Sequence, residues 1–192
     1  ARAILEKKLP GGIVWIEREG QTWQKAYGQR AVRPRTEPTT PDTLYDMASL
    51  TKVLATAPAI LILAEQGRLN LDATVAKYIP AFSGHGRESV TLRHLLTHTS
   101  GLRPGISLRD KWNGAQPAIG LACRETLRQQ PGTKFTYSDI NFILLGEIVR
   151  RISGKPLNEF AKDHIFTPLK MHDTGFLPAT ALTSRIAPTE AI

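Results

Sequence analysis

Hydrophobic residues follow two different spacings along this chain, and the first of them indicates β-strands. Near the N-terminus, "GGIVWIERE" and "TWQKAYGQR" are rich in Val, Ile, Trp and Tyr, and Glu19-Gly20-Gln21 separates them. Runs of β-branched and aromatic residues around a short glycine-containing break are typical of a β-hairpin. We therefore expect a short helix and then two paired strands in the first thirty residues.

The spacing becomes helical after a loop, "VRPRTEPTTPDTLYD", that contains three prolines and shows no periodicity. The pattern then predicts about five helices and no further convincing strand. Apolar residues at helical spacing predict helices over residues 50–66, 91–98, 116–130, 139–154 and 156–166. Since a two-stranded hairpin is marginal by itself, the predicted sheet needs further strands or a covering layer.

The composition is that of a soluble globular protein, with 41% hydrophobic and 22% charged residues among 192. The most apolar run, "VLATAPAILILAEQG", is shorter than the roughly 20 residues of a membrane span and contains Pro58, so no transmembrane segment is predicted. The single cysteine, Cys123, excludes an internal disulfide. Its amphipathic surroundings predict a buried structural thiol.

A net charge of +8 raises the hypothesis of a nucleic-acid-binding domain. The basic residues are dispersed, however, without a run of five and without a recognition motif. Attraction to acidic cell-wall polymers or to anionic substrates is equally compatible with such a charge. We therefore expect no nucleic-acid partner.

The stretch "LYDMASLTK" places Ser49 three residues before Lys52 at the start of a predicted helix. Residues at this spacing share one helix face, and the helix start favours developing negative charge. A lysine with a depressed pKa can also take the proton of a serine, which is the chemistry of an S-x-x-K motif. The alternative is that Ser49 only caps the helix, because serine is a favoured N-cap residue and short motifs match by chance.

A second polar group, Tyr137-Ser138-Asp139, follows a Pro-Gly loop and precedes a predicted helix. Asp139 is a candidate N-cap of that helix. A tyrosine beside a lysine can become a phenolate, which is a competent general base.

His94 and His98 have the i, i+4 spacing of a metal site, but Leu95 stands where a zincin helix has glutamate. Core packing with a hydrogen-bonded imidazole is the favoured interpretation, and no metal site is predicted. No serine lies in G-x-S-x-G, and no nucleotide-binding glycine pattern occurs. We expect no cofactor.

In their order and spacing, "SLTK", "LRHLLTHTSGL", "PGTKFTYSD" and "TPLKMHDTGF" resemble the serine β-lactamase and penicillin-binding protein superfamily. The similarity is greatest to its branch of class C-like β-lactamases, D-alanyl-D-alanine peptidases and carboxylesterases. The resemblance implies an α+β fold, with an α/β lobe and an all-helical lobe. It is a β-lactamase/transpeptidase-like fold that is incomplete in this chain. Residues 1–48 would be the N-terminal part of the α/β lobe and residues 49–192 the nucleophile helix and helical lobe, with the C-terminal strands absent.

The resemblance also implies site residues. Ser49 matches the acylated nucleophile and Lys52 the lysine of its proton network. Tyr137 matches the tyrosine of a Y-x-N motif, the general base or proton relay. Asp139 stands at a substrate-binding position where asparagine is most common, and its charge would hold Lys52 protonated and move base duty to Tyr137. That departure favours ester substrates over β-lactams. The K-T-G or H-x-G triplet of the family has no match.

A serine hydrolase that forms an acyl-enzyme on an ester, a β-lactam or a D-Ala-D-Ala peptide is therefore expected. The alternative is a catalytically silent relative that binds peptidoglycan or a related polymer. The missing strands imply a second polypeptide carrying the C-terminal half of the protein. A periplasmic or extracellular location is favoured by the resemblance, although no leader is visible.

Overall fold

The computed structural model describes residues 2–107 and 112–189, and the chain divides into two compact units. One unit consists of residues 1–48 and 176–192, and the other of residues 49–175. The sequence-based division kept 176–192 with the helical part. The structure groups this segment with the N-terminal residues because Leu44 and Ile186 pair as a parallel bridge and Arg185 Nε donates to the Asp42 carbonyl at 2.9 Å.

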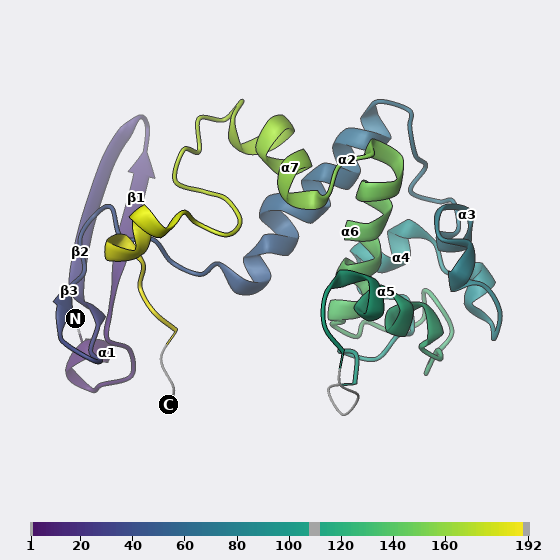
Figure 1. Cartoon of the computed structure of the whole chain (residues 1–192), viewed down its shortest axis with the longest axis horizontal. Helices are drawn as coiled ribbons and strands as arrows, with labels where there is room; N and C mark the ends of the chain where they lie inside the picture. The colour runs from purple at the N-terminus through teal and green to yellow at the C-terminus, as the bar shows by residue number, and fades with distance from the viewer. Residues whose placement is uncertain (1, 108–111, 190–192) are drawn as a thin grey trace. The chain divides into compact units, whose positions relative to one another are not determined.

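The first unit contains the predicted hairpin, drawn in purple in Figure 1. Its elements are α1 (Arg2–Leu5), β1 (Gly11–Arg18), β2 (Gln21–Ala31), β3 (Glu37–Pro38) and the 3-10 helix η6 (Thr180–Arg185). The three strands are antiparallel in the order β1-β2-β3. The two-residue strand β3 lies in the segment predicted as loop, where Glu37 forms an ion pair with Arg30 of β2.

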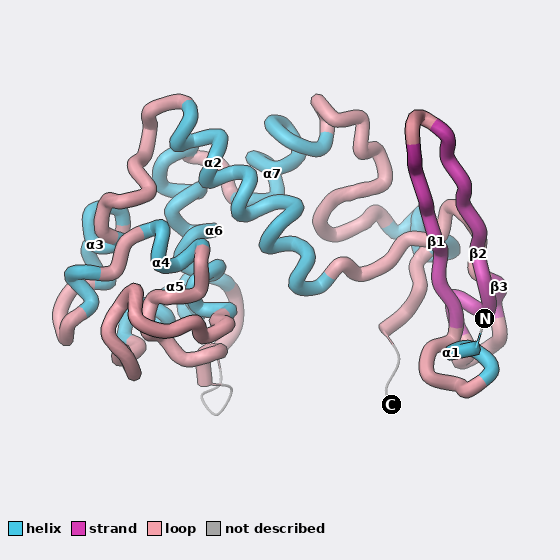
Figure 2. Tube along the Cα trace, turned by 180° about the vertical axis from the view of Figure 1, so that it is seen from behind, coloured by secondary structure: helices cyan, strands magenta, loops and turns pink. Residues whose placement is uncertain are grey.

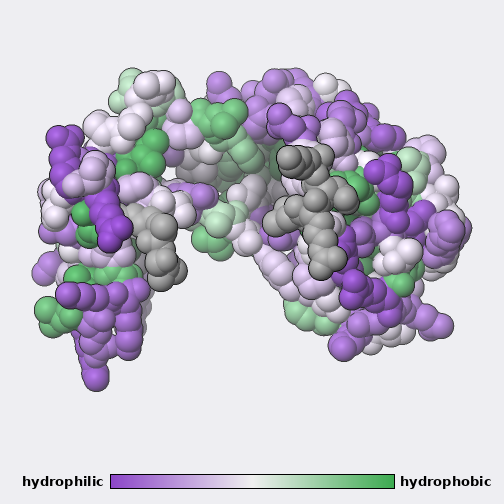
Figure 3. All heavy atoms as spheres, turned by 60° about the horizontal axis from the view of Figure 1, so that its bottom comes forward, coloured by the Kyte–Doolittle hydropathy of each residue, from purple (hydrophilic) through white to green (hydrophobic). Residues whose placement is uncertain are grey.

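The hairpin exposes large hydrophobic side chains. Trp15, Ile16 and Trp23 are 58%, 56% and 47% exposed. Elsewhere hydrophilic residues cover much of the visible surface of both units (Figure 3). A strand pair with apolar residues on its surface fits the expectation that the sheet needs a further layer.

Helices (cyan in Figure 2) and turns (pink) make up the described part of the second unit. The segment that contains Ser49 and Lys52 combines a 3-10 turn, η1 (Ala48–Leu50), a π-helix, η2 (Lys52–Thr56), and α2 (Ala57–Glu65), where a single regular helix was predicted. The remaining helices of four or more residues in this unit are α3 (Val75–Tyr78), α4 (Leu92–Leu96), α5 (Ala115–Arg124), α6 (Asp139–Ser153), α7 (Leu157–Ala161) and the π-helix η5 (Lys162–Phe166).

Helix α5 ends six residues earlier than the sequence pattern predicted. The backbone turns extended at Glu125, with ψ of 138°. The Glu125 carboxylate pairs with Arg103, and its carbonyl accepts a hydrogen bond from Arg87 Nη1 at 2.9 Å. These tertiary contacts outweigh the helical periodicity of the following residues.

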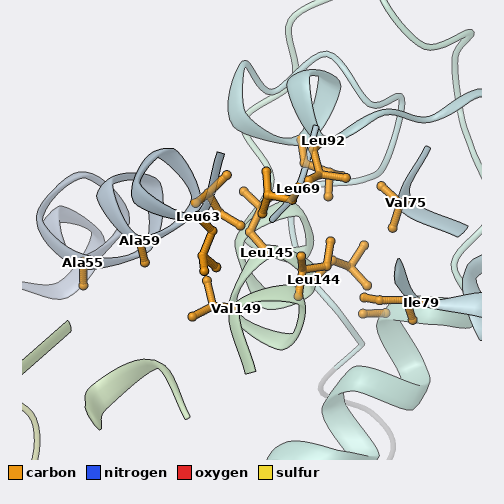
Figure 4. Packing of buried hydrophobic residues seen from close by; sticks show 14 of the residues in the cluster. Ala55, Ala59, Leu63, Leu69, Val75, Ile79, Leu92, Leu144, Leu145 and Val149 are labelled. Carbon is orange, nitrogen blue, oxygen red and sulfur yellow. The ribbon is translucent and has the colours of Figure 1, made fainter. Parts of the chain in front are cut away.

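The core of the second unit lies between α2 and α6. Ile60 and Leu63 of α2 and Leu144 and Leu145 of α6 are fully buried. In Figure 4 the labelled residues of these two helices point into one cluster. Burying each such side chain stabilises the fold by roughly 1.5–3 kcal/mol. Cys123 is free and buried in the same core, as predicted.

The helical stretch Ala48–Glu65 has the length and hydropathy of a membrane span, which the sequence pattern did not indicate. By these two measures alone it could cross a bilayer. In the structure its Lys52 is paired with a carboxylate, and its Ala59, Ile60 and Leu63 belong to the core.

Candidate functional site

The turn from Ser49 into η2 brings Ser49 and Lys52 together. Ser49 lies in η1, and Ala48 before it has a left-handed backbone with φ of 42°. Ser49 is therefore not the N-cap of a regular α-helix. In a tight turn, side chains three residues apart lie almost above one another. Lys52 Nζ accordingly donates to Ser49 Oγ at 3.2 Å.

Lys52 lies at the centre of the polar cluster. Its ammonium is 2.7 Å from Asp139 Oδ1 and 5.0 Å from the centre of the Tyr137 ring. Burial lowers the pKa of Lys52, but the hydrogen bonds and charges of Asp139 and Tyr137 outweigh it and raise this pKa above the usual value. Lys52 is therefore protonated at neutral pH. It is placed to donate hydrogen bonds rather than to accept a proton.

The phenol of Tyr137 has the opposite tendency. Hydrogen bonds with Lys52 and Ser49 lower the pKa of Tyr137, while the charge of Asp139 works against this shift. A lowered phenol pKa means a larger phenolate fraction at a given pH, which is the form that can accept a proton. The structure thus brings the predicted residues Ser49, Lys52 and Tyr137 into one hydrogen-bonded group.

Asp139 begins helix α6 rather than capping it. Ser138 occupies the N-cap position with an extended backbone, and Asp139 is the first helical residue. The Asp139 amide donates to the Pro104 carbonyl at 2.7 Å. Its carboxylate is therefore available to Lys52, at the end of the helix where negative charge is favoured.

His98 is the site neighbour that sequence reasoning missed. It had been considered with His94, but His94 Nδ1 accepts from the Thr91 amide of the α4 capping box. The His98 ring instead packs against Tyr137, with ring centres 4.5 Å apart. The described residues contain no group of three His, Cys, Asp or Glu able to hold a metal ion. Only the position of His98 within "HLLTHTSGL" pointed to this residue.

Comparison with known proteins identifies the family: this chain belongs to the Beta-lactamase family, whose profile matches residues 1–191. Protein flp of Staphylococcus aureus (strain MW2) is 34% identical over 176 residues, which are 88% of this chain and 35% of that protein. A putative D-alanyl-D-alanine carboxypeptidase of Escherichia coli (strain K12) is 34% identical over 152 residues, which are 72% of this chain and 35% of that protein.

A solved class C β-lactamase has the same fold, with a TM-score of 0.84 and 26% identity. The match covers 97% of this chain and 51% of that structure. The chain thus spans about a third of the length of these curated relatives and about half of the solved structure. The predicted α+β, β-lactamase-like and incomplete fold is confirmed.

Proposed function

We propose that this chain carries the nucleophile of a serine hydrolase, which forms an acyl-enzyme on Ser49. The observation that carries the proposal is the hydrogen-bonded group around Lys52. Its ammonium contacts Ser49 Oγ and Asp139 Oδ1, and its hydrogen bond to Tyr137 lowers the pKa of that phenol. A nucleophile beside its base, with a fixed positive charge between them, is the arrangement that acyl transfer requires.

The proposed reaction assigns one role to each group. The Tyr137 phenolate accepts the Ser49 proton while Oγ bonds to the substrate carbonyl carbon. The single bond between the carbonyl carbon and the leaving group then breaks, and the leaving group takes the proton from Tyr137. Water then attacks the acyl carbon while Tyr137 accepts its proton. The bond between the acyl carbon and Ser49 Oγ breaks, Oγ takes the proton from Tyr137, and the acid is released. Lys52 remains protonated throughout and stabilises Tyr137 whenever it is a phenolate.

Asp139 favours carboxylic esters as substrates over β-lactams and D-Ala-D-Ala peptides. A carboxylate engaged by Lys52 has no N–H with which to donate to a substrate amide carbonyl. Its charge also opposes an anionic substrate group at this position. An ester with a neutral acyl part lacks both difficulties.

We further propose that a second polypeptide, carrying the C-terminal half of the protein, completes the sheet and supplies the missing K-T-G or H-x-G strand. Two observations support this partner. The chain covers about half of a solved class C β-lactamase, and the hairpin exposes Trp15, Ile16 and Trp23. A folded, monomeric chain of 192 residues with full hydrolytic turnover would contradict it.

A catalytically silent binding protein is the second candidate function. The ion pair of Asp139 with Lys52 favours it, because it occupies a carboxylate and an ammonium that substrate recognition would otherwise use. Such a protein would be retained on insoluble peptidoglycan without forming an adduct.

Native mass spectrometry after exposure to p-nitrophenyl acetate, and separately to a penicillin, tests the proposal. We expect an acetyl adduct that peptide mapping places on Ser49, formed faster than any penicilloyl adduct. Ser49→Ala should abolish it, and Ser89→Ala, a change at an exposed serine outside the site, should leave it unchanged. Adduct formation that survives Ser49→Ala, or no adduct with either reagent when the C-terminal half of the protein is present, would overturn the assignment.

A further inference from the structure

We infer that His98 is a positioning residue, which holds Tyr137 in place as the neutral Nε2–H tautomer by accepting the amide hydrogen bond of Ser138. This inference rests on the proposed role of Tyr137 and adds a group that does not itself contact the substrate. It concerns a histidine that the proposed proton transfers do not use.

His98 contacts the chain on both sides of Tyr137. Its main-chain carbonyl accepts from the Thr136 amide at 2.8 Å, and its Nδ1 accepts from the Ser138 amide at 3.0 Å. Its ring packs against the Tyr137 ring at 4.5 Å with an interplanar angle of 33°. One residue therefore fixes the amide of Thr136, the peptide that follows Tyr137 and the Tyr137 ring.

The backbone of His98 is left-handed, with φ of 57°. This conformation is uncommon for residues other than glycine and is enriched several-fold for Asn, Asp and His. It persists where surrounding contacts determine it. For His98 these contacts are the two amides that flank Tyr137.

The hydrogen bonds around His98 determine its tautomer. The Ser138 amide can only donate, so Nδ1 must be the unprotonated nitrogen. Asn141 Nδ2 donates to the same nitrogen at 3.2 Å, since Asn141 Oδ1 already accepts from the Ser100 hydroxyl at 2.6 Å. Ser100 Oγ in turn accepts from the Leu102 amide. A proton on Nδ1 would face two donors in a buried position.

The groups facing His98 keep it neutral. Burial and the positive charge of Lys52 lower the pKa of His98, and the charge of Asp139 opposes them. The other neighbours are the rings of Phe135, Tyr137 and Phe142. The neutral form thus persists through neutral pH. Protonation in acid removes the acceptor of the Ser138 amide and should release Tyr137.

Two matched substitutions separate positioning from general structure. Asn carries an oxygen at the same number of bonds from the backbone as Nδ1 and tolerates the left-handed conformation. In His98→Gln the polar atoms lie one bond further out, near the place of Nε2. His98→Asn should therefore keep the acceptor for Ser138, and His98→Gln should lose it.

The rate of Ser49 acetylation by p-nitrophenyl acetate, measured as a function of pH, is the main readout. We expect His98→Gln to lose about 100-fold in this rate, and His98→Asn to stay within about tenfold of the native chain, because small misplacements of a catalytic group have effects of that size. The acid-side loss of rate caused by His98 protonation should be absent from His98→Asn. Equal rates for the two variants, with circular dichroism showing both folded, would overturn the inference.

A second measurement does not depend on catalysis. Nitrogen NMR of the native chain, with the His98 signals assigned from the His98→Asn variant, should show an unprotonated Nδ1 and a protonated Nε2 at neutral pH. Phenolate absorbance, with Tyr137→Phe as the reference, should show Tyr137 titrating at different pH in native and His98→Gln chains. A protonated Nδ1 would overturn the inference. Absence of Ser49 acetylation together with the expected NMR and titration results would reject the proposed hydrolase and retain the positioning role.

Discussion

The buried hydrogen bond between Ser100 and Asn141 should be measurable as a coupling energy. The two side chains are 1% and 0% exposed, and the Ser100 hydroxyl donates to Asn141 Oδ1 at 2.6 Å. A neutral hydrogen bond contributes about 1 kcal/mol net, and a buried polar atom left without its partner costs roughly 1–3 kcal/mol. Ser100→Ala leaves Asn141 Oδ1 in that state, and Asn141→Ala does the same to the Ser100 hydroxyl.

The double variant removes both the Ser100 hydroxyl and Asn141 Oδ1, so neither is left buried without a hydrogen-bond partner. Its loss of unfolding free energy should be smaller than the sum of the two single losses by about 1–2 kcal/mol, within the range measured for residues in contact. The Leu102 amide loses its acceptor in both Ser100→Ala and the double variant, so this loss cancels in the comparison.

Urea unfolding followed by far-ultraviolet circular dichroism gives the four free energies, provided that the denaturant dependence is the same for all chains. Ser100→Ala combined with Ser89→Ala is the matched control, because Ser89 lies outside the network, and these losses should add within about 0.5 kcal/mol. If the losses from Ser100→Ala and Asn141→Ala also add within that margin, the buried bond does not exist and the orientation assigned to the Asn141 amide loses its support.

Two further predictions concern Asp139 in the site and Gly101, which follows Ser100 in the chain. Asp139→Asn should move the pH range of Ser49 acetylation downward. The reason is that Asp139 raises the pKa of Lys52 and also opposes the lowering of the Tyr137 pKa. A pH–rate profile that is unchanged or displaced upward would contradict these electrostatic roles of Asp139. Gly101→Ala should destabilise the chain by at least about 1–2 kcal/mol in urea unfolding, because Gly101 has φ of 83° and an added methyl group meets a main-chain carbonyl of the neighbouring loop. Gly105→Ala is the control and should change the unfolding free energy little, because its added methyl group meets no other atom. Equal effects of the two substitutions would exclude this strain.

Local features of the site could be predicted from the sequence, and tertiary ones could not. Ser49 and Lys52 lie three residues apart, so any tight helical turn brings them together. Tyr137 and Asp139 lie far along the chain from Ser49, and only the resemblance to a known family linked them. The role of His98 depends on hydrogen bonds to amides 38 and 40 positions away, which no local pattern records.

The fold shows the same division. Helix α6 was predicted almost to the residue, because a continuous apolar stripe and Gly154 define it. Helix α5 was predicted too long, since the ion pair of Glu125 with Arg103 that accompanies its end is tertiary. Strand β3 was missed because Glu37 and Pro38 have little strand propensity, and pairing with β2 alone places them in the sheet.

The π-helix η2 affects how Ser49 and Lys52 are oriented around the helix axis relative to the buried residues of α2. A π-turn contains one residue more than an α-turn, and in this chain it separates Lys52 from the buried residues of α2. Each residue of an α-helix advances about 100° around the axis. Deletion of Val53, which is exposed, would restore a regular helix and leave Ile60 and Leu63 in the core. It would also leave Ser49 and Lys52 in nearly the same direction around the helix axis, because one regular turn replaces one wide turn. The π-turn therefore lets this segment hold one more residue without turning Ser49 and Lys52 away from Tyr137.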